Sequence, residues 1–419
     1  MAEYKFWETQ PVPQFSEVAR DDSEEGPVVT ISPHTFSREP VPLLEGYAWS
    51  DIDLEDGSKL CELYDLLEKH YVTDDDDMFR FHYSLACLQW ALQPPGWKPS
   101  WNVGVRECDS GALVACITAI PVELRVKERT LSVAEVNFLC VHQTLRFMRL
   151  TPVLVREITR RCARDGLSQA VYTSGSVLPR PFSSARYYHR SLNPEKLIAV
   201  GFSFVPPRST IEEEVKRFEV PVETATPGLR PMTNADIPAV QVLLTRYLAR
   251  YDVAPIFTED EIRHHLLFNK LDDDTGKPIV QAYVVENSET CSITDVVSFF
   301  LLPCTVLQNE SYNNLNAAYC SYYASTAAWD EGQDLKARLL ALVRDVLVLA
   351  KKIGCDVFNA VTNADNSLFL SADELGFGPG DGALHYYLYN YRTAYVAGGV
   401  DAYNRADGLM GQGVGLVMI

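Results

Sequence analysis

The sequence predicts a duplicated α/β fold with mixed sheets. A helix, three strands, a second helix and a further strand occur in residues 58–174, and the same order occurs in residues 234–361. The chain has 419 residues, which suits two to three domains of about 150 residues each. Its hydrophobic content of 47% is enough for large packed cores. We expect the halves to meet near Pro206–Pro227 and to occupy residues 1–206 and 207–419.

The elements follow from the spacing of apolar residues, because helices repeat every 3.6 residues and strands every two. Residues 1–50 have little regular pattern. In the first half the spacing predicts helices at 58–71 and 151–166, and strands at 101–107, 112–126, 135–141 and 168–174. In the second half it predicts helices at 234–251, 257–267 and 334–354, and strands at 278–287, 292–303, 315–325 and 355–361. Thr258 and Glu261 have the spacing of a capping box.

Charge and cysteine usage exclude some classes of function. The formal net charge is −19, whereas nucleic-acid binding needs a basic face. An acidic surface suits a cationic partner, or serves solubility alone. The 10 cysteines have neither CxxC pairs nor zinc-ligand spacing, so we expect reduced thiols and no metal. We found no signal peptide and no apolar run of about 18 residues, so we expect a soluble cytoplasmic protein.

A candidate anion site follows the strand at 135–141. Arg146 and Arg149 come next, and Thr151 and Pro152 then suit the N-cap and first position of a helix. Free N–H groups of a first helical turn, together with two cations, suit a pyrophosphate. The spacing R-x-x-R-x-T resembles the R-x-x-G-x-G/A loop of acyl-CoA-dependent N-acyltransferases. The alternative is two solvated arginines before an ordinary helix.

The second half offers an internal contrast. Asp330, Glu331 and Asp334 occupy the corresponding helix start, where their carboxylates would repel a phosphate. If the duplication is real, only one of the two loops can bind an anion.

Several motifs are similar to those of one family. EVNFLCVH (135–142) resembles the first signature of eukaryotic glycylpeptide N-tetradecanoyltransferase (N-myristoyltransferase), and GFGPGDGALHYYLYN (376–390) resembles the second. Further similar blocks are YKFWETQPVP, DDDDMFRFHYS, AVYTSG, YYHRSLNPEKL, GLRPM and LLTRYL. The resemblance spans nearly the whole chain. It implies a duplicated fold like that of the GCN5-related acetyltransferases, with pseudo-two-fold symmetry, one myristoyl-CoA site and one peptide site.

The resemblance also implies a mechanism, the transfer of tetradecanoate from CoA to an N-terminal glycine amine. The backbone N–H groups of Phe138 and Leu139 would hold the thioester oxygen, which requires a bulge in the strand. The main-chain carboxylate of Ile419 would act as base, and Asn137 and Thr173 would orient the amine. Taken alone, the apolar stretch GVGLVMI would be a fraying tail or an edge strand, and VNFLCV a plain core strand.

Myristoyl-CoA is implied as a substrate rather than a prosthetic group. The residues implied to bind it are Tyr4, Lys5, Phe6, Trp7, Phe138, Leu139, Cys140, Val141, Arg146, Phe147, Arg149, Leu150 and Thr151. Phe147 and Met148 depart from the family pattern, since many relatives have a small or basic residue there.

The peptide is the other implied substrate. The residues implied to contact it are Val72, Asp74, Asp76, Phe79, Phe81, Tyr172, Tyr187, His189, Tyr319, Asn359, Asp381 and Leu384. The acidic run at 74–77 would favour lysine or arginine downstream of the glycine. In most proteins such a run is a solvated loop, and it lacks EF-hand spacing for calcium. His189 is expected to set specificity rather than to catalyse, and Cys304 stands where relatives often have serine.

Two other functions remain open at this point. One is an N-terminal or lysine acetyltransferase of the same superfamily. The other is a catalytically dead peptide-binding protein, against which the intact VNFLCV, Arg149 and the apolar C-terminus argue. We expect a monomer with no nucleic-acid partner and no membrane insertion.

Overall fold

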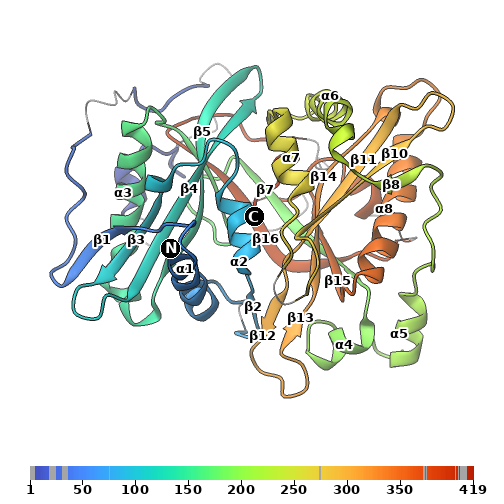
Figure 1. The fold of residues 1–419 in the computed structure, drawn as a ribbon, viewed down its shortest axis with the longest axis horizontal. Helices are drawn as coiled ribbons and strands as arrows, with labels where there is room; N and C mark the ends of the chain where they lie inside the picture. The colour runs from blue at the N-terminus through green and yellow to red at the C-terminus, as the bar shows by residue number, and fades with distance from the viewer. Residues whose placement is uncertain are drawn as a thin grey trace.

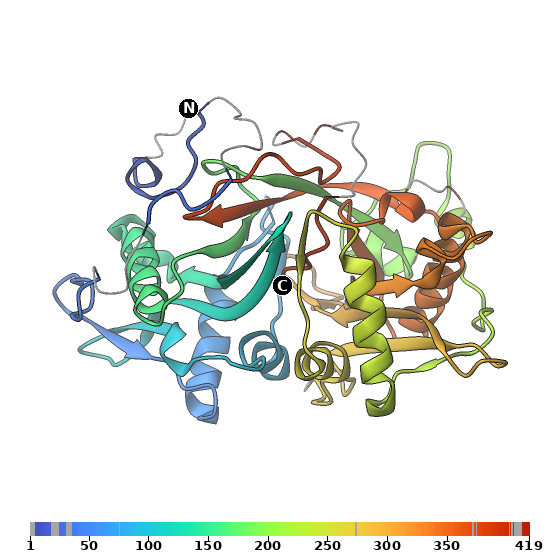
Figure 2. The ribbon, with the colours of Figure 1, turned by 90° about the horizontal axis from the view of Figure 1, so that it is seen from above.

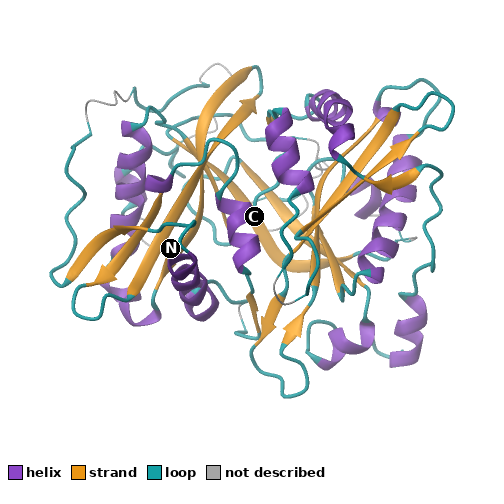
Figure 3. Cartoon of the chain, viewed as in Figure 1, coloured by secondary structure: helices purple, strands orange, loops and turns teal. Residues whose placement is uncertain are grey.

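The computed structural model describes residues 5–17, 25–30, 36–74, 76–272, 275–370, 373, 375–401, 403, 405 and 413–419. In this part of the chain one large mixed sheet runs through the molecule, and helices flank it (Figure 3). This arrangement confirms the predicted α/β class. No helix among the described residues has the length and apolarity to cross a membrane.

The large sheet has 13 strands in the described residues. In order across the sheet they are β1 (Tyr47–Asp51), β3 (Asn102–Glu107), β4 (Leu113–Val126), β5 (Arg129–Val141), β6 (Ala170–Ser174), β16 (Gly378–Tyr389), β7 (Ser183–Ser191), β15 (Val357–Val361), β14 (Ala317–Ser325), β11 (Ile293–Leu301), β10 (Val280–Glu286) and β8 (Leu229–Pro231), with β9 (Val253–Pro255) paired to β4. A small second sheet joins β13 (Asn314–Leu315), β12 (Cys304–Val306) and β2 (Phe79–Phe81).

The α-helices are α1 (Gly57–His70), α2 (Leu85–Leu92), α3 (Leu150–Arg164), α4 (Pro194–Ala199), α5 (Ile211–Arg217), α6 (Ile237–Leu248), α7 (Glu259–Leu267), α8 (Leu335–Lys352) and α9 (Ser367–Leu370). The buried face of α3, with Leu150, Leu154 and Ile158, packs on one side of the first-half strands. In the second half, α6, α7 and α8 each contribute buried residues to the core around the strands, among them Val240, Ile262 and Leu342. Each half therefore has a large apolar core of its own.

The predicted duplication is confirmed by the order of elements. The series β3, β4, β5, α3, β6 in the first half corresponds to β10, β11, β14, α8, β15 in the second. The halves lie side by side, the first coloured blue to green and the second yellow to red (Figure 1).

The two halves also exchange strands at the middle of the sheet. β7 pairs with β15 of the second half, and β16 pairs with β6 of the first half. Both strands cross between the halves in Figure 2. The periodicity pattern missed β7 and β16, because polar and glycine residues interrupt their apolar alternation, as in SSARYYHRS and GPGDGALHYYLY.

Three predicted details change in the structure. Thr151 is not the N-cap of α3, because Arg149 takes that place in the left-handed region (φ 55°) and the helix begins at Leu150. Pro152 is therefore the third helical residue rather than the first. The predicted helix at 234–251 is shorter, since a 3₁₀ turn at Asn234–Asp236 precedes α6. The capping box of Thr258 and Glu261 is confirmed.

Candidate active site

The site is built around an irregularity in the β4–β5 ladder. Cys116 pairs with Cys140 and Thr118 with Asn137, so two residues of β5 oppose one residue of β4. Phe138 takes a left-handed conformation, with φ of 50°. The Thr118 hydroxyl donates to the Asn137 carbonyl at 2.9 Å and fixes this geometry from within the core. The bulge expected at this position is therefore confirmed, and the N–H groups of Phe138 and Leu139 fall outside the paired register.

The side chain of Phe138 holds the bulge in place. It is 2% exposed, and its ring meets Tyr83 edge-on at 4.9 Å and Tyr71 at 6.0 Å. A left-handed conformation is costly for a residue with a bulky side chain, so packing of this kind must offset it.

An opening between β5 and β6 lies beside the bulge. These parallel strands pair only at Ala134–Ala170 and Glu135–Val171. If the same register continued, Asn137 would face Thr173, two positions beyond the Glu135–Val171 pair. The ladder has already ended there. Asn137 and Thr173 thus stand at the two edges of the opening, next to the bulged backbone.

Glu135 is a site residue that the sequence did not single out. It is 6% exposed and accepts a hydrogen bond from Asn137 Nδ2 at 2.8 Å. Burial raises the pKa of Glu135 to about 7. The i, i+2 spacing of Glu135 and Asn137 on a strand was the available signal, because it places both side chains on one face.

The candidate anion loop is a 3₁₀ helix, Gln143–Met148, that leads into α3. Arg146 Nη2 donates to the His70 carbonyl at the end of α1, at 2.7 Å, while Arg149 is exposed at the start of α3. The His70 and His142 rings lie 3.8 Å apart. Burial, followed by the nearby His142 and arginines, lowers the pKa of His70 to about 4. The loop therefore carries its positive charge on arginines rather than on His70.

The corresponding loop of the second half is arranged differently. Asp334 is the N-cap of α8, and its side chain accepts from the N–H groups of Lys336 and Ala337 at 2.9 and 3.3 Å. The first turn of α8 is thereby capped from within the chain. The first turn of α3 has no side-chain cap.

The N-terminal segment packs on the first half. The Trp7 ring stacks on Tyr172 at 5.8 Å, and Tyr172 stacks on Tyr387 at 5.0 Å. The Arg156 guanidinium of α3 lies 5.7 Å from the Phe6 ring. Phe6 and Trp7 thus lie against α3 and β6, close to Thr173, and Tyr172 is held with them. Tyr4 lies outside the described residues.

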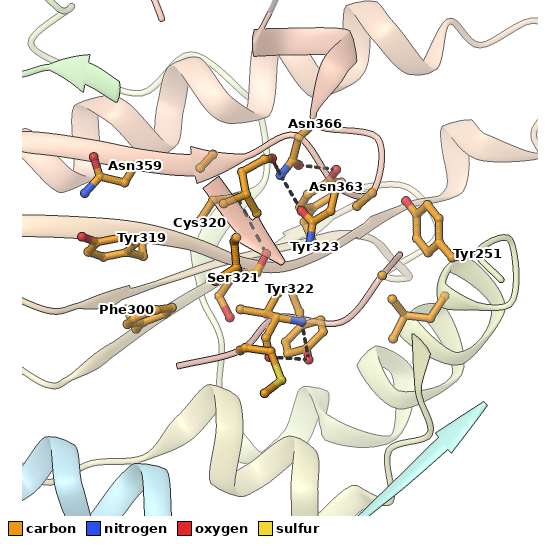
Figure 4. Close-up of a pocket in the computed structure, with 18 of the residues that line it drawn as sticks. Tyr251, Phe300, Tyr319, Cys320, Ser321, Tyr322, Tyr323, Asn359, Asn363 and Asn366 are labelled. Carbon is orange, nitrogen blue, oxygen red and sulfur yellow. Dashed lines mark hydrogen bonds between the residues drawn. The ribbon is translucent and has the colours of Figure 1, made fainter. Parts of the chain in front are cut away.

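Residues from both halves line one cavity near the middle of the molecule (Figure 4). Of the predicted peptide contacts, Tyr187, Tyr319, Asn359 and Leu384 line it. Phe81 lies beside this cavity, with its ring 6.4 Å from Tyr319.

His189 lies on β7 and pairs with Gly378 of β16, the strand that carries the second signature. Its Nδ1 is 2.7 Å from Asn359 Oδ1, and burial lowers its pKa. The Phe202 ring meets His189 at 5.2 Å and Phe79 at 5.7 Å. At Gly380 a Cβ would stand 2.2 Å from His189 Nε2, so only glycine allows this backbone to pass over the histidine. Asp381 follows it and is exposed.

The acidic loop has a partly structural role. Asp74 Oδ1 accepts from the N–H groups of Met78 and Phe79, both at 2.7 Å. Asp77 accepts from the Thr73 hydroxyl at 2.6 Å. Asp76 and Val72 are exposed, and Asp75 is outside the described residues.

The C-terminal segment is buried rather than frayed. Val414 and Leu416 are 0% and 1% exposed, and Gly415 N donates to Val253 O at 2.7 Å. Ile419 lines a second cavity together with Glu135. Figure 1 places the C-terminus between the two halves. The structure therefore brings Ile419 to the β5 side of the molecule, as the predicted site requires.

A duplicated α/β fold, with a bulged strand beside an open strand pair, is the arrangement expected above for an acyl-CoA-dependent N-acyltransferase. Comparison with known proteins is more specific. The family models of the N-terminal and C-terminal domains of myristoyl-CoA:protein N-myristoyltransferase match residues 28–185 and 199–417.

Individual relatives match over the whole chain. Glycylpeptide N-tetradecanoyltransferase of Aspergillus fumigatus is 51% identical over 100% of this chain and 84% of its own length. That of Schizosaccharomyces pombe is 46% identical, over 100% and 90%. A crystal structure of Saccharomyces cerevisiae N-myristoyltransferase with bound myristoyl-CoA is similar, with a TM-score of 0.93 and 42% identity, over 100% of this chain and 95% of that one. The chain belongs to the myristoyl-CoA:protein N-myristoyltransferase family and is an acyltransferase.

The buried Glu135 gives a prediction for stability. Its pKa in the folded protein lies above the ordinary glutamate value of 4.5, so the folded state binds more protons between that pH and about 7. The contribution of Glu135 to the free energy of unfolding therefore falls as pH rises through this window. Between pH 4.5 and pH 7 the free energy of unfolding of the wild-type protein should fall by roughly 3 kcal/mol relative to that of Glu135→Gln, at about 1.4 kcal/mol per pH unit. Urea unfolding of both proteins at several pH values measures this difference, and parallel curves would contradict a buried, neutral Glu135.

Proposed function

We propose that this chain transfers a tetradecanoyl group from myristoyl-CoA to the amine of an N-terminal glycine. The observation that carries the proposal is the bulge at Phe138–Leu139, which lies beside Asn137 and the opening to Thr173. The names of the relatives and the myristoyl-CoA bound to the S. cerevisiae protein support the donor and the acceptor.

The bulge would serve as an oxyanion hole. Attack on a thioester builds negative charge on its carbonyl oxygen, and positioned N–H donors typically stabilise such a transition state by a few kcal/mol each. The N–H groups of Phe138 and Leu139 are candidates because the ladder register skips them. The packing of Phe138 on Tyr83 would keep them oriented before substrate binds.

The donor would lie along the first half. The CoA pyrophosphate would contact Arg146, Arg149 and the uncapped first turn of α3, where the helix dipole also favours an anion. Phe6 and Trp7, packed nearby, would enclose the nucleotide end. The remaining proposed contacts are Lys5, Cys140, Val141, Phe147, Leu150 and Thr151.

The acceptor amine must lose a proton before it attacks. An α-amino group has a pKa of about 7.7–8.0, so it arrives largely as an ammonium. The Ile419 carboxylate would accept this proton, since burial beside Val417 would raise the basicity of that carboxylate. Asn137 and Thr173 would hold the amine at the opening between β5 and β6.

The peptide would run along the cavity between the halves. Tyr187, Tyr319 and Asn359 would contact it, with His189 as a specificity residue rather than a catalyst. The exposed Asp76 and Asp381 would favour lysine or arginine downstream of the glycine.

We also propose that residues 1–206 form the half that binds myristoyl-CoA, and that residues 207–419 supply most of the peptide groove and the tail. All 10 cysteines are free thiols, which supports a cytoplasmic location. We propose a monomer, since a single chain supplies both substrate sites.

Mass spectrometry after incubation with acyl-CoAs tests the activity. The acceptors are two octapeptides that begin with glycine, one with a downstream lysine and one with a neutral residue in its place. A tetradecanoyl adduct on the N-terminal amine should form, faster on the lysine peptide at low salt. An acetyl adduct alone would indicate an acetyltransferase, and no adduct with measurable peptide binding would indicate a protein that binds peptide without catalysis.

The anion site is tested by charge reversal. Arg149→Glu places a negative charge at the proposed pyrophosphate position, so KM for myristoyl-CoA should rise at least about tenfold. Glu331→Lys, at the corresponding loop of the second half, is the matched control and should leave that KM unchanged. An unchanged KM in the Arg149 variant would remove this loop from the donor site.

The base is tested at the end of the chain. Because the proton acceptor would be a main-chain group, Ile419→Leu should keep most of the activity. Deleting Met418 and Ile419, or adding residues after Ile419, should lower kcat by roughly 10²-fold. Higher pH should partly restore kcat, because more of the amine is then neutral. Wild-type kcat in the extended protein would show that the terminal carboxylate is not the base.

A further inference from the structure

The second half repeats the bulge of the first. On β11 and β14, Phe299 pairs with Cys320 and Val297 with Tyr323, so Ser321 and Tyr322 together oppose one residue. The Ser298 hydroxyl donates to the Tyr322 carbonyl at 2.6 Å. In the first half the Thr118 hydroxyl bonds one position further along, to the carbonyl of its paired residue Asn137, so the register shift is repeated but its supporting contact differs. The duplication has therefore preserved a second strand irregularity.

The second half also repeats the opening between parallel strands. β14 and β15 pair only from Ala317–Val357 to Tyr319–Asn359, and the ladder then ends. Beyond that point Ser321, Tyr322 and Asn363 line the cavity in Figure 4, together with Val417 and Met418 of the C-terminal segment. The tail of the chain thus occupies the place in the second half that an acyl donor would occupy in the first.

Tyr322 and Asn363 hold the last backbone groups of this tail by polar contacts, and the Tyr386 hydroxyl donates to Leu416 O at 3.4 Å. Val417 N donates to the Tyr322 hydroxyl at 3.2 Å, and Asn363 Nδ2 donates to Leu416 O at 3.1 Å. The two side chains come from different elements, β14 and the loop after β15. Tyr322 is 8% exposed and Asn363 is 3% exposed, so both contacts are shielded from water.

Backbone hydrogen bonds hold the tail as far as Gly415, from Gly415 N to Val253 O at 2.7 Å and from Ala364 N to Val414 O at 2.8 Å. Beyond Gly415 the polar side-chain contacts hold the register, because apolar contacts are non-directional. An extended chain that slipped by one residue would move by about 3.3 Å and turn each side chain to the opposite face. The carboxylate of Ile419 lies only two residues beyond Val417. A misplacement of about 1 Å is enough to slow a positioned reaction about a hundredfold.

We propose that Tyr322 and Asn363 form a clamp that fixes the tail register and so places the Ile419 carboxylate against the substrate amine. Neither residue touches the reacting atoms, so both are positioning residues. The proposal rests on the proposed role of the terminal carboxylate as base.

The test combines kinetics with hydrogen exchange on the full chain. The variants are Tyr322→Phe, Asn363→Leu and the double variant. Tyr395→Phe is the control, because it removes a hydroxyl that donates to Val400 O at 2.8 Å, outside the tail. The C-terminal peptide should exchange its amide hydrogens at least tenfold faster in the double variant than in the wild-type protein or in the control.

Kinetics with myristoyl-CoA and a glycine-initiated octapeptide complete the test. At pH 7 the double variant should lose at least tenfold in kcat, while KM for myristoyl-CoA stays within twofold. Part of the loss should be recovered at pH 9, where the amine arrives neutral. A loss of the same size at every pH would reflect general damage to the fold and would overturn the proposal.

The exchange data separate this proposal from the one on which it rests. Unchanged exchange in the double variant would overturn the clamp and leave the terminal carboxylate as a candidate base. Faster exchange with wild-type kcat would overturn the positioning role and leave the terminal carboxylate as a candidate base. A C-terminally extended protein with wild-type kcat would overturn the carboxylate as base, and the positioning role with it.

Discussion

The one-residue irregularity between β4 and β5 is the constraint on which the rest of the site depends. It turns the backbone at Phe138 into the left-handed region, which few bulky residues adopt without support. That support comes from the core, where Tyr83 packs on the Phe138 ring and Thr118 bonds to the Asn137 carbonyl. A regular strand would use its N–H groups in the ladder and could offer none to a substrate.

Each half has a register shift in the corresponding strand pair and an opening beside it, and the two halves differ in what the opening holds. In the first half, arginines and an uncapped helix start favour an anionic donor. In the second half, Asp334 caps the helix start and the tail of the chain enters the opening. The capped helix start and the tail both lie in the second half, so among the described residues only the first half has a helix start and an opening free to receive an anionic donor.

The polar groups at the centre of the molecule are placed at a cost in stability. Glu135 is buried with one amide partner, and burial also lowers the pKa of His265, which lines the same cavity, to about 3. Glu135 and His265 are therefore both neutral between about pH 3 and pH 7.

The sequence alone was sufficient to predict the family and most of the helices and strands, because both predictions depend on patterns within short segments. Signature motifs such as EVNFLCVH lie on single strands, and strongly periodic helices such as α3 and α8 are recognisable without their neighbours. The bulge could be anticipated from the chemistry that the resemblance implied. The N-cap at Arg149 could not, because the preceding 3₁₀ helix sets the direction in which α3 starts.

Only the tertiary structure decided the contacts between distant residues. Glu135 became a site residue because the tail brings Ile419 to its cavity. The exchange of β7 and β16 depends on pairing across the halves, for which single strands give no signal. Tyr322 and Val417 are 95 residues apart, and their contact exists because the β14–β15 ladder ends where the tail arrives. Periodicity specifies which face of a strand is buried, whereas the partner on that face is chosen by the packing of the whole chain.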